Sequence, residues 1–223
     1  MAGMRRFEQR RRNTEKRKRN PFVIIGCEGK NKTEKIYFNN FNSRQCIIKF
    51  SKGNSTDPIG IVQDLINFIK SNEIELEEND KVYAVFDTDV GQNKKQRIEE
   101  AKSLAAENGV EIITSTPTFE LWFLLHFGFT TKVFVSNKAL QEELARKIPN
   151  YSKINNTYLT VKDLTGQAIE NAKRLEQYQL KEGHLCRYRG CNCVSTIAFR
   201  SLWIIKSNQQ YKFRVFCRAN SNK

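Results

Sequence analysis

The chain has 223 residues, of which 39% are hydrophobic, and its formal net charge is +14. A chain of this length can bury a sizeable core, so we expect one domain with extensions. No apolar run approaches the ~18 residues of a membrane-spanning helix, which excludes a transmembrane protein. The N-terminus lacks the apolar segment of a signal peptide, which excludes a protein secreted by that route. We therefore expect a cytoplasmic protein with no membrane partner and with reduced cysteines.

The positive charge is concentrated at the two ends. Residues 1–20 contain nine Lys/Arg and two Glu, and residues 181–223 contain nine Lys/Arg and one Glu, which leaves a net charge of −1 between them. A like-charged block with few apolar residues does not form a core, so we expect residues 1–20 to be a basic, disordered arm. Arg10, Arg11 and Arg12 are its candidate nucleic-acid contacts, and a solubilising tail is the alternative.

Hydrophobic patterns predict four strands that alternate with helices. Short apolar runs typical of buried strands occur at residues 22–27, 46–50, 82–86 and 110–114. Helical spacing predicts a helix with Thr33 as its N-cap, a second over residues 58–72 and a third around Ile98 to Ala105. This alternation predicts the α/β class, with a mostly parallel four-stranded sheet flanked by helices.

Further helices are predicted after the fourth strand. The first is largely apolar and has Pro117 in its first turn. Glu120 lies in this helix, and because a carboxylate there is rarely buried alone, we expect it to face the ends of neighbouring strands. His126 is interpreted as a core histidine, since no ligand set accompanies it. Helices at 137–148 and 161–180 form a helical C-terminal extension.

Two carboxylates end the third strand. Asp87 and Asp89 are two residues apart, so in extended backbone their side chains leave the same face. Two anions this close repel, and Mg²⁺ is the natural counter-cation because it prefers hard oxygen ligands; Mn²⁺ is the substitute we expect. Ligands of open α/β sheets also bind at the carboxyl ends of strands. A solvated turn is the alternative, because Asp is common in turns and Gly91 follows.

The first strand also ends at a carboxylate, Glu28. The following glycines and Lys30 resemble a phosphate-binding P-loop, but that loop needs four residues between its glycines, and here Gly26 and Gly29 are separated by two. We therefore do not predict nucleotide binding. Lys30 and Lys32 are instead candidate contacts to nucleic-acid phosphates.

Three motifs together are more specific than any one alone. They are Cys-Glu28-Gly with Thr33-Glu34 beyond it, Phe-Asp87-Thr-Asp89, and Ser-x-Pro-x-Phe-Glu120-Leu-Trp-x-Leu-Leu-His126-Phe. The chain thereby resembles the RloB family, whose members have a Toprim-type fold and are associated with bacterial antiphage defence. The resemblance covers about residues 20–180.

The resemblance implies how the chain is divided. Residues 21–135 would form a Toprim-like α/β core and residues 136–185 a helical extension. The remaining segment, 186–223, is basic and rich in cysteine, and it departs from the family pattern around Asn192 to Thr196. Its boundary and role stay open.

The resemblance also implies roles for the acidic residues. Glu28 matches a glutamate with a general acid/base or metal-binding role, and Asp87 and Asp89 match a metal-binding Asp-x-Asp. Glu120 matches a later motif, as a metal ligand or a support for the ligands. The implied activity is Mg²⁺-dependent cleavage of DNA or RNA. The implied partners are nucleic acid, an ATPase encoded by a neighbouring gene and further copies of the chain.

Two other functions are compatible with the same residues. Phe-Asp87-Thr-Asp89-Val-Gly also resembles the nucleophile motif of haloacid-dehalogenase-like phosphatases, in which Asp87 would attack phosphorus and Asp89 would be the acid/base. That superfamily carries the motif on its first strand, which this chain does not. Alternatively, the chain is a non-catalytic nucleic-acid-binding or regulatory subunit, which metal titration would distinguish from both enzymes.

Removal of residues 1–20 should weaken nucleic-acid binding mainly at low salt, because exposed charges attract phosphates through a field that salt screens. Fluorescence anisotropy of a labelled oligonucleotide at two salt concentrations would measure this. An equal loss of affinity at both concentrations would contradict an electrostatic role for the arm.

Overall fold

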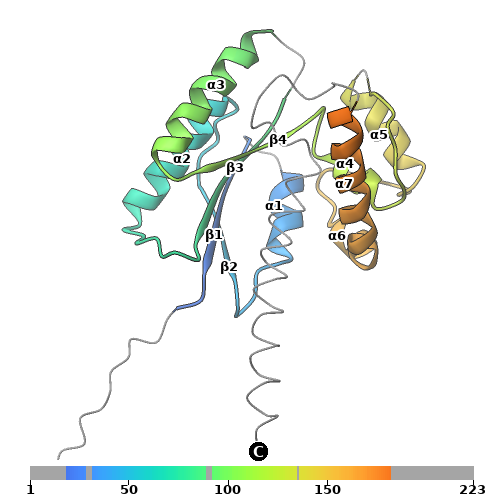
Figure 1. The fold of residues 1–223 in the computed structure, drawn as a ribbon. Helices are drawn as coiled ribbons and strands as arrows, with labels where there is room; N and C mark the ends of the chain where they lie inside the picture. Colours follow the sequence, from blue (N-terminus) through green and yellow to red (C-terminus); the bar gives the residue numbers. More distant parts are fainter. Residues whose placement is uncertain (1–18, 29–31, 89–91, 135, 182–223) are drawn as a thin grey trace, which may run out of the picture.

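A parallel four-stranded sheet forms the centre of the protein (Figure 1). The computed structural model describes residues 19–28, 32–88, 92–134 and 136–181. The strands are β1 (Phe22–Cys27), β2 (Ile47–Phe50), β3 (Lys81–Asp87) and β4 (Glu111–Ser115), in the order β2-β1-β3-β4. Every adjacent pair is parallel. The predicted α/β class and four-stranded sheet are confirmed, and the arrangement is consistent with a Toprim-like fold.

Helices cover both faces of the sheet (Figure 1). One face carries α2 (Pro58–Ser71) and α3 (Gln92–Glu107). The other carries α1 (Lys32–Asn39) and α4 (Glu120–Leu125). The helical segment packed beyond α4 consists of α5 (Asn137–Ala145), α6 (Tyr158–Val161), the 3₁₀ turn η1 (Lys162–Leu164) and α7 (Thr165–Lys181). The predicted helical C-terminal segment is therefore confirmed.

Strand alternation divides the core into two layers. In β3, Tyr83 and Val85 pack in the cluster shared with α1 and α4, whereas Val82, Ala84 and Phe86 pack in the cluster shared with α2 and α3. Both faces are thus apolar, which explains the continuous hydrophobic runs in the sequence. By the same alternation, the next residue in β3 turns toward α1 and α4.

Gly26 allows α2 to approach β1 closely. A Cβ atom at this position would lie 2.8 Å from Leu65 Cγ and 3.3 Å from Ile61 Cγ2, both in α2. The first distance is shorter than real Cβ contacts and the second is tighter than most, so a larger residue at this position would require Leu65 and Ile61 to shift. The glycine therefore serves helix–strand packing inside β1, which agrees with the absence of a P-loop in the sequence.

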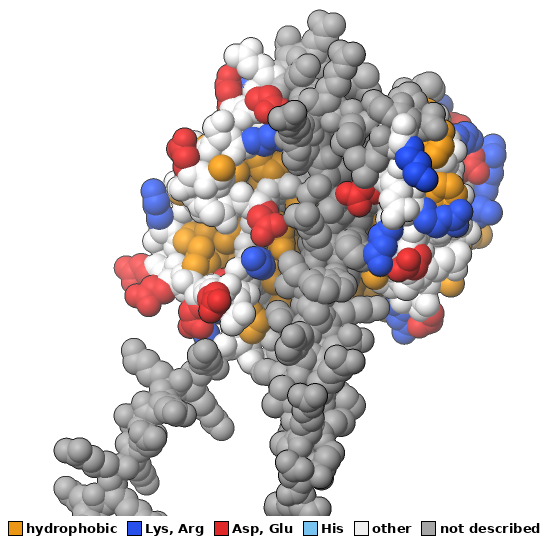
Figure 2. All heavy atoms as spheres, in the orientation of Figure 1, with side chains coloured by type: hydrophobic (Ala, Val, Ile, Leu, Met, Phe, Trp, Pro, Cys, Tyr) orange, Lys and Arg blue, Asp and Glu red, His pale blue; other side chains and the backbone are white. Residues whose placement is uncertain are grey.

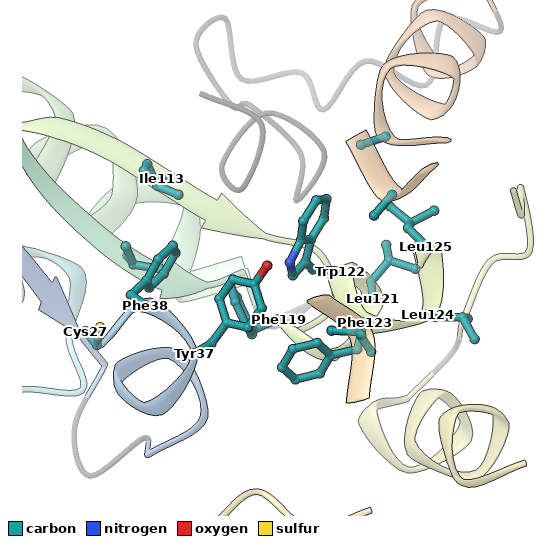
Figure 3. Close-up of a cluster of buried hydrophobic side chains, with 14 of the residues drawn as sticks. Cys27, Tyr37, Phe38, Ile113, Phe119, Leu121, Trp122, Phe123, Leu124 and Leu125 are labelled. Atoms are coloured by element: carbon teal, nitrogen blue, oxygen red, sulfur yellow. The ribbon is translucent and has the colours of Figure 1, made fainter. Parts of the chain in front are cut away.

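Aromatic packing joins α1 to α4. The ring of Tyr37, in α1, is almost fully buried and lies at the centre of this packing (Figure 3). It makes tilted or edge-to-face contacts with Phe38, Phe41, Phe119, Trp122, Phe123 and Tyr158. Such pairs each stabilise by about 0.5–1.5 kcal/mol beyond their burial. The first turns of α1 and α4 are consequently held in a fixed relation.

Two predicted helix starts differ from the structure. Thr33 is not the N-cap of α1 but lies inside it, and its Oγ1 donates to the carbonyl of Lys153 at 3.1 Å. Pro117 precedes α4, which begins at Glu120. The chain before Pro117 is still held at the strand ends, because Thr116 Oγ1 is 2.6 Å from Thr88 Oγ1.

The core interpretation of His126 is confirmed. Its side chain is fully buried, and Nδ1 lies 2.9 Å from the carbonyl oxygen of Trp122. Burial lowers the pKa of His126 to about 4, so the ring is neutral at physiological pH.

Within the described part of the chain, no helix is both long and apolar enough to cross a bilayer.

Asp80 links, through hydrogen bonds, the residues at the amino ends of β1 and β3. Its side chain is 1% exposed, and it accepts hydrogen bonds from Arg19 Nη1 (2.9 Å) and from the backbone N–H groups of Phe22 and Glu77 (both 2.7 Å). The guanidinium of Arg19 also lies 4.0 Å from the centre of the Phe22 ring. Burial acts to raise the pKa of Asp80, but these hydrogen bonds outweigh it and hold the pKa below its usual value.

Asp80→Asn should lower the free energy of unfolding at pH 7 by about 3 kcal/mol, because Arg19 loses its buried partner. The folded-state pKa is depressed, so this stabilisation is present above the unfolded-state pKa and is lost as pH falls through the folded-state pKa. Urea unfolding from pH 7 down to pH 3 would measure both effects. The exposed Asp163→Asn is the matched control, and an equal change in both variants would contradict this assignment.

Candidate functional site

Glu28 and Asp87 meet where the two central strands end. Glu28 directly follows β1 and Asp87 is the last residue of β3. The backbone N–H of Asp87 donates to Glu28 Oε2 at 3.2 Å, and the next N–H, of Thr88, donates to the carbonyl of Ser115 at 2.8 Å. The end of β3 is therefore fastened to the ends of both neighbouring strands.

This position is the topological switch point of the sheet. From β1 the chain passes to β2 on one side, and from β3 it passes to β4 on the other. The helices that follow β1 and β3 accordingly lie on opposite faces (Figure 1). Open α/β sheets bind their ligands in the crevice that this reversal leaves.

Two further carboxylates approach from the helices. Glu34, in the first turn of α1, and Glu120, the first residue of α4, are each 2% exposed, and Asp87 is 8% exposed. The negative charges of Glu34, Glu120 and Glu28 all act on Asp87. We call these four residues the acidic cluster. Two strand ends and two helix starts contribute one carboxylate each.

Burial and the charges of neighbouring carboxylates make Asp87 and Glu34 hard to ionise. Burial, followed by the charges of Glu34, Glu120 and Glu28, raises the pKa of Asp87 to about 9. Burial is also the main cause that raises the pKa of Glu34 to about 7, with Glu120 and Glu28 adding to it. Without a cation, the folded protein therefore favours the protonated form of at least some of these groups.

Glu120 is held by the segment that follows the sheet. Its Oε1 accepts hydrogen bonds from Tyr151 Oη (3.3 Å) and Gln141 Nε2 (3.4 Å), and it lies 3.3 Å from Lys153 Nζ. Burial and then the charge of Glu120 raise the pKa of Tyr151, so the hydroxyl stays protonated and remains a donor. The helical segment after the sheet therefore contributes residues to the same site as the strand ends.

The donor types suit a hard divalent cation. Carboxylate oxygens are the ligands that Mg²⁺ and Mn²⁺ prefer. Asp87 Oδ1 is buried and has no hydrogen-bond partner among the described residues, so an acceptor is available in the acidic cluster. The described residues do not by themselves form a group of three or more His, Cys, Asp or Glu side chains with metal-binding geometry. Asp87, Glu28, Glu34 and Glu120 fit such an ion by chemistry, and a closed ligand shell needs a further contribution.

The structure brings together three of the predicted site residues. Glu28, Asp87 and Glu120 lie in the acidic cluster. Lys32 is the first residue of α1. The other predicted site residues, Asp89, Lys30, Arg10, Arg11 and Arg12, lie outside the described residues.

Sequence reasoning did not assign Glu34, Tyr151 or Lys153 to the site. A usable signal existed for Glu34, because it lies three and four residues before the buried Tyr37 and Phe38 and so shares the apolar face of α1. An acid on an apolar helix face is the same signal that identified Glu120. No local pattern marks Lys153.

Comparison with known proteins assigns the family. The family model described as RloB-like protein matches residues 23–198, which is more than half of the chain. The chain belongs to the RloB-like protein family. The RloB-like match contains every residue of the acidic cluster and continues beyond residue 180, where we expected the resemblance to end. No curated protein and no solved structure matches the chain.

In EDTA, the free energy of unfolding of this RloB-like protein should fall as pH rises from about 5 to about 9. The pKa of Asp87 is raised in the folded state, so its contribution to stability is present below the unfolded-state pKa and is lost as pH rises through about 9. Asp87→Asn removes this titration, and its stability relative to wild type should therefore increase over that range. Denaturant unfolding at several pH values would measure the difference. A difference independent of pH would show that Asp87 ionises freely.

Proposed function

We propose that the chain is a Mg²⁺-dependent phosphodiester hydrolase that cleaves DNA or RNA in bacterial antiphage defence. The observation that carries the enzymatic part is the meeting of Glu28, Asp87, Glu34 and Glu120 at the switch point of a parallel sheet. Family membership supports the defence role, through the association that the RloB resemblance implies.

The proposed chemistry assigns tasks to Asp87, Asp89, Glu28 and Glu120. When bound, Mg²⁺ or Mn²⁺ supplies positive charge that neutralises the scissile phosphate and polarises an attacking water. Asp87 and Asp89, with Glu28, would hold the ion. Glu28 is also the proposed general acid/base, and its hydrogen bond with the Asp87 backbone orients it toward the end of β3. Glu120, fixed by Tyr151, would complete or support the ligand set.

The distribution of charge supports an anionic substrate. Figure 2 shows Lys and Arg side chains gathered on the side of the molecule that α5 occupies in Figure 1. Lys138, in α5, and Arg146 and Lys147, just after it, are exposed. Such a surface attracts nucleic-acid phosphates over several ångströms. Arg10, Arg11, Arg12, Lys30 and Lys32 are the other contacts we propose.

The proposed partners follow from what the sequence lacks and from the family resemblance. The chain has no P-loop motif, so we propose that an ATPase encoded by a neighbouring gene supplies any ATP-dependent control. Association of further copies of the chain is the second proposed interaction. A phosphatase of the haloacid-dehalogenase type has less support, because Asp87 ends the third strand of the chain.

Asp87→Asn and Asp89→Asn should each abolish Mg²⁺-induced stabilisation and lower cleavage by orders of magnitude, because each removes a proposed ligand. Both should fold at least as well as wild type in EDTA, since each removes a repelling charge. Glu28→Gln should also abolish turnover while retaining some metal binding, and Glu120→Gln should have a smaller effect. Cleavage of tRNA, single-stranded and duplex substrates with Mg²⁺, Mn²⁺ or EDTA would measure activity, and thermal unfolding would measure metal binding.

Asp163→Asn is the control, because it removes an exposed aspartate far along the chain from the acidic cluster. Metal-dependent cleavage that survives in the double variant Asp87→Asn with Asp89→Asn, in protein free of contaminating nuclease, would refute the proposed site. Metal binding without cleavage of any substrate would favour a non-catalytic subunit.

A further inference from the structure

Lys153 brings a positive charge to the acidic cluster. It lies between α5 and α6, and its Nζ is 3.3 Å from Glu120 Oε1. Its backbone carbonyl accepts the hydrogen bond from Thr33 Oγ1, in α1. The backbone of Lys153 is thus fastened to α1, while its side chain reaches the first residue of α4.

The charge of Lys153 acts on more than its direct partner. It opposes the rise in pKa of both Asp87 and Glu34. Lys153 is therefore a counter-cation that the protein itself supplies to the acidic cluster. A divalent ion bound to these carboxylates would have the same electrostatic effect.

The two members of the ion pair differ in exposure. The side chain of Lys153 is 45% exposed, whereas that of Glu120 is 3% exposed. The lysine therefore reaches a buried anion from the solvent side. Its flexible stem and compact ammonium group suit a change of partner, because a lysine binds phosphate as a point charge without fixed geometry.

Glu120 does not depend on Lys153 alone. Tyr151 Oη and Gln141 Nε2 donate to the same oxygen, Oε1. If the lysine left, the buried carboxylate would keep two hydrogen bonds, so the change would not leave it without partners. The Thr33 hydrogen bond holds the backbone, so only the side chain of Lys153 has to move.

We propose that Lys153 is the phosphate-binding residue of the site: it pairs with Glu120 while no divalent cation is bound, and it contacts a phosphate oxygen of the nucleic acid once a divalent cation balances the carboxylates. This inference rests on the proposed function and adds a residue and a step to it. This change of partner by Lys153 makes substrate binding depend on the divalent cation, because Lys153 leaves Glu120 only when the divalent cation neutralises the acidic cluster.

The test compares Lys153→Gln with Lys153→Arg and with Lys70→Gln. Lys70 is an exposed lysine in the last turn of α2, on the opposite face of the sheet from α1 and α4, and its replacement removes the same charge away from Glu120. Thermal unfolding in EDTA and in Mg²⁺ gives stability and metal affinity. Anisotropy of a labelled single-stranded oligonucleotide in Ca²⁺, at a fixed salt concentration, gives substrate binding without requiring turnover.

Lys153→Gln should unfold at a lower temperature than wild type in EDTA, and it should gain more stability from Mg²⁺, because the competing cation is gone. Its affinity for the oligonucleotide in Ca²⁺ should fall about tenfold, as expected for the loss of one charge-assisted contact. Lys153→Arg should recover most of both properties, since it keeps the charge. Lys70→Gln should retain wild-type metal response and most of the oligonucleotide affinity.

Two results would overturn the inference while leaving the proposed function intact. The first is an oligonucleotide affinity of Lys153→Gln equal to that of Lys70→Gln, which would exclude a phosphate contact. The second is a Mg²⁺-induced stabilisation of Lys153→Gln equal to that of wild type, which would exclude the change of partner by Lys153. A wild-type protein that neither gains stability from Mg²⁺ nor cleaves nucleic acid would instead overturn the proposed function, and this inference with it.

Discussion

The convergence of buried carboxylates at one end of a parallel sheet is the constraint on which the rest of the structure depends. Repulsion and loss of solvation both oppose it, as the raised pKa values of Asp87 and Glu34 show. Packing must therefore hold the groups together. The aromatic contacts of Tyr37 do this for α1 and α4, and the hydrogen bond between the Asp87 N–H and Glu28 does it for the strands.

The aspartates at the two ends of the sheet have opposite surroundings. At the amino ends of β1 and β3, Asp80 has a full set of donors and an arginine partner, so its ionised form stabilises the fold. At the carboxyl ends, Asp87 has a buried oxygen with no partner among the described residues. Satisfied polar groups support the framework, while under-satisfied ones mark the place where a ligand would lower the free energy.

The helical segment after the sheet is part of the site and not an appendage to it. Gln141, Tyr151 and Lys153 all contact Glu120 from that segment. A fragment limited to the sheet and its flanking helices would lack all three of these partners of Glu120. The family match extends across this segment as well, to residue 198. We therefore regard the site as a joint product of the α/β core and the helical extension.

The sequence by itself determined the class of fold and part of the site. Apolar runs with strand or helix periodicity predicted all four strands, because burial on both faces leaves a local pattern. Carboxylates at strand ends predicted Glu28 and Asp87, and an acid in an apolar helix predicted Glu120. The starts of α1 and α4 were predicted wrongly: Thr33 lies inside α1, and Pro117 precedes α4.

Only the tertiary structure decided which charges meet. Glu34 joins the acidic cluster because aromatic packing sets the rotation of α1 against α4, a choice that depends on residues from both helices. Lys153 reaches Glu120 because its backbone is fastened to Thr33, 120 positions earlier in the chain. Contacts over such separations leave no periodic trace, since each depends on how complete elements pack and not on the residues beside it.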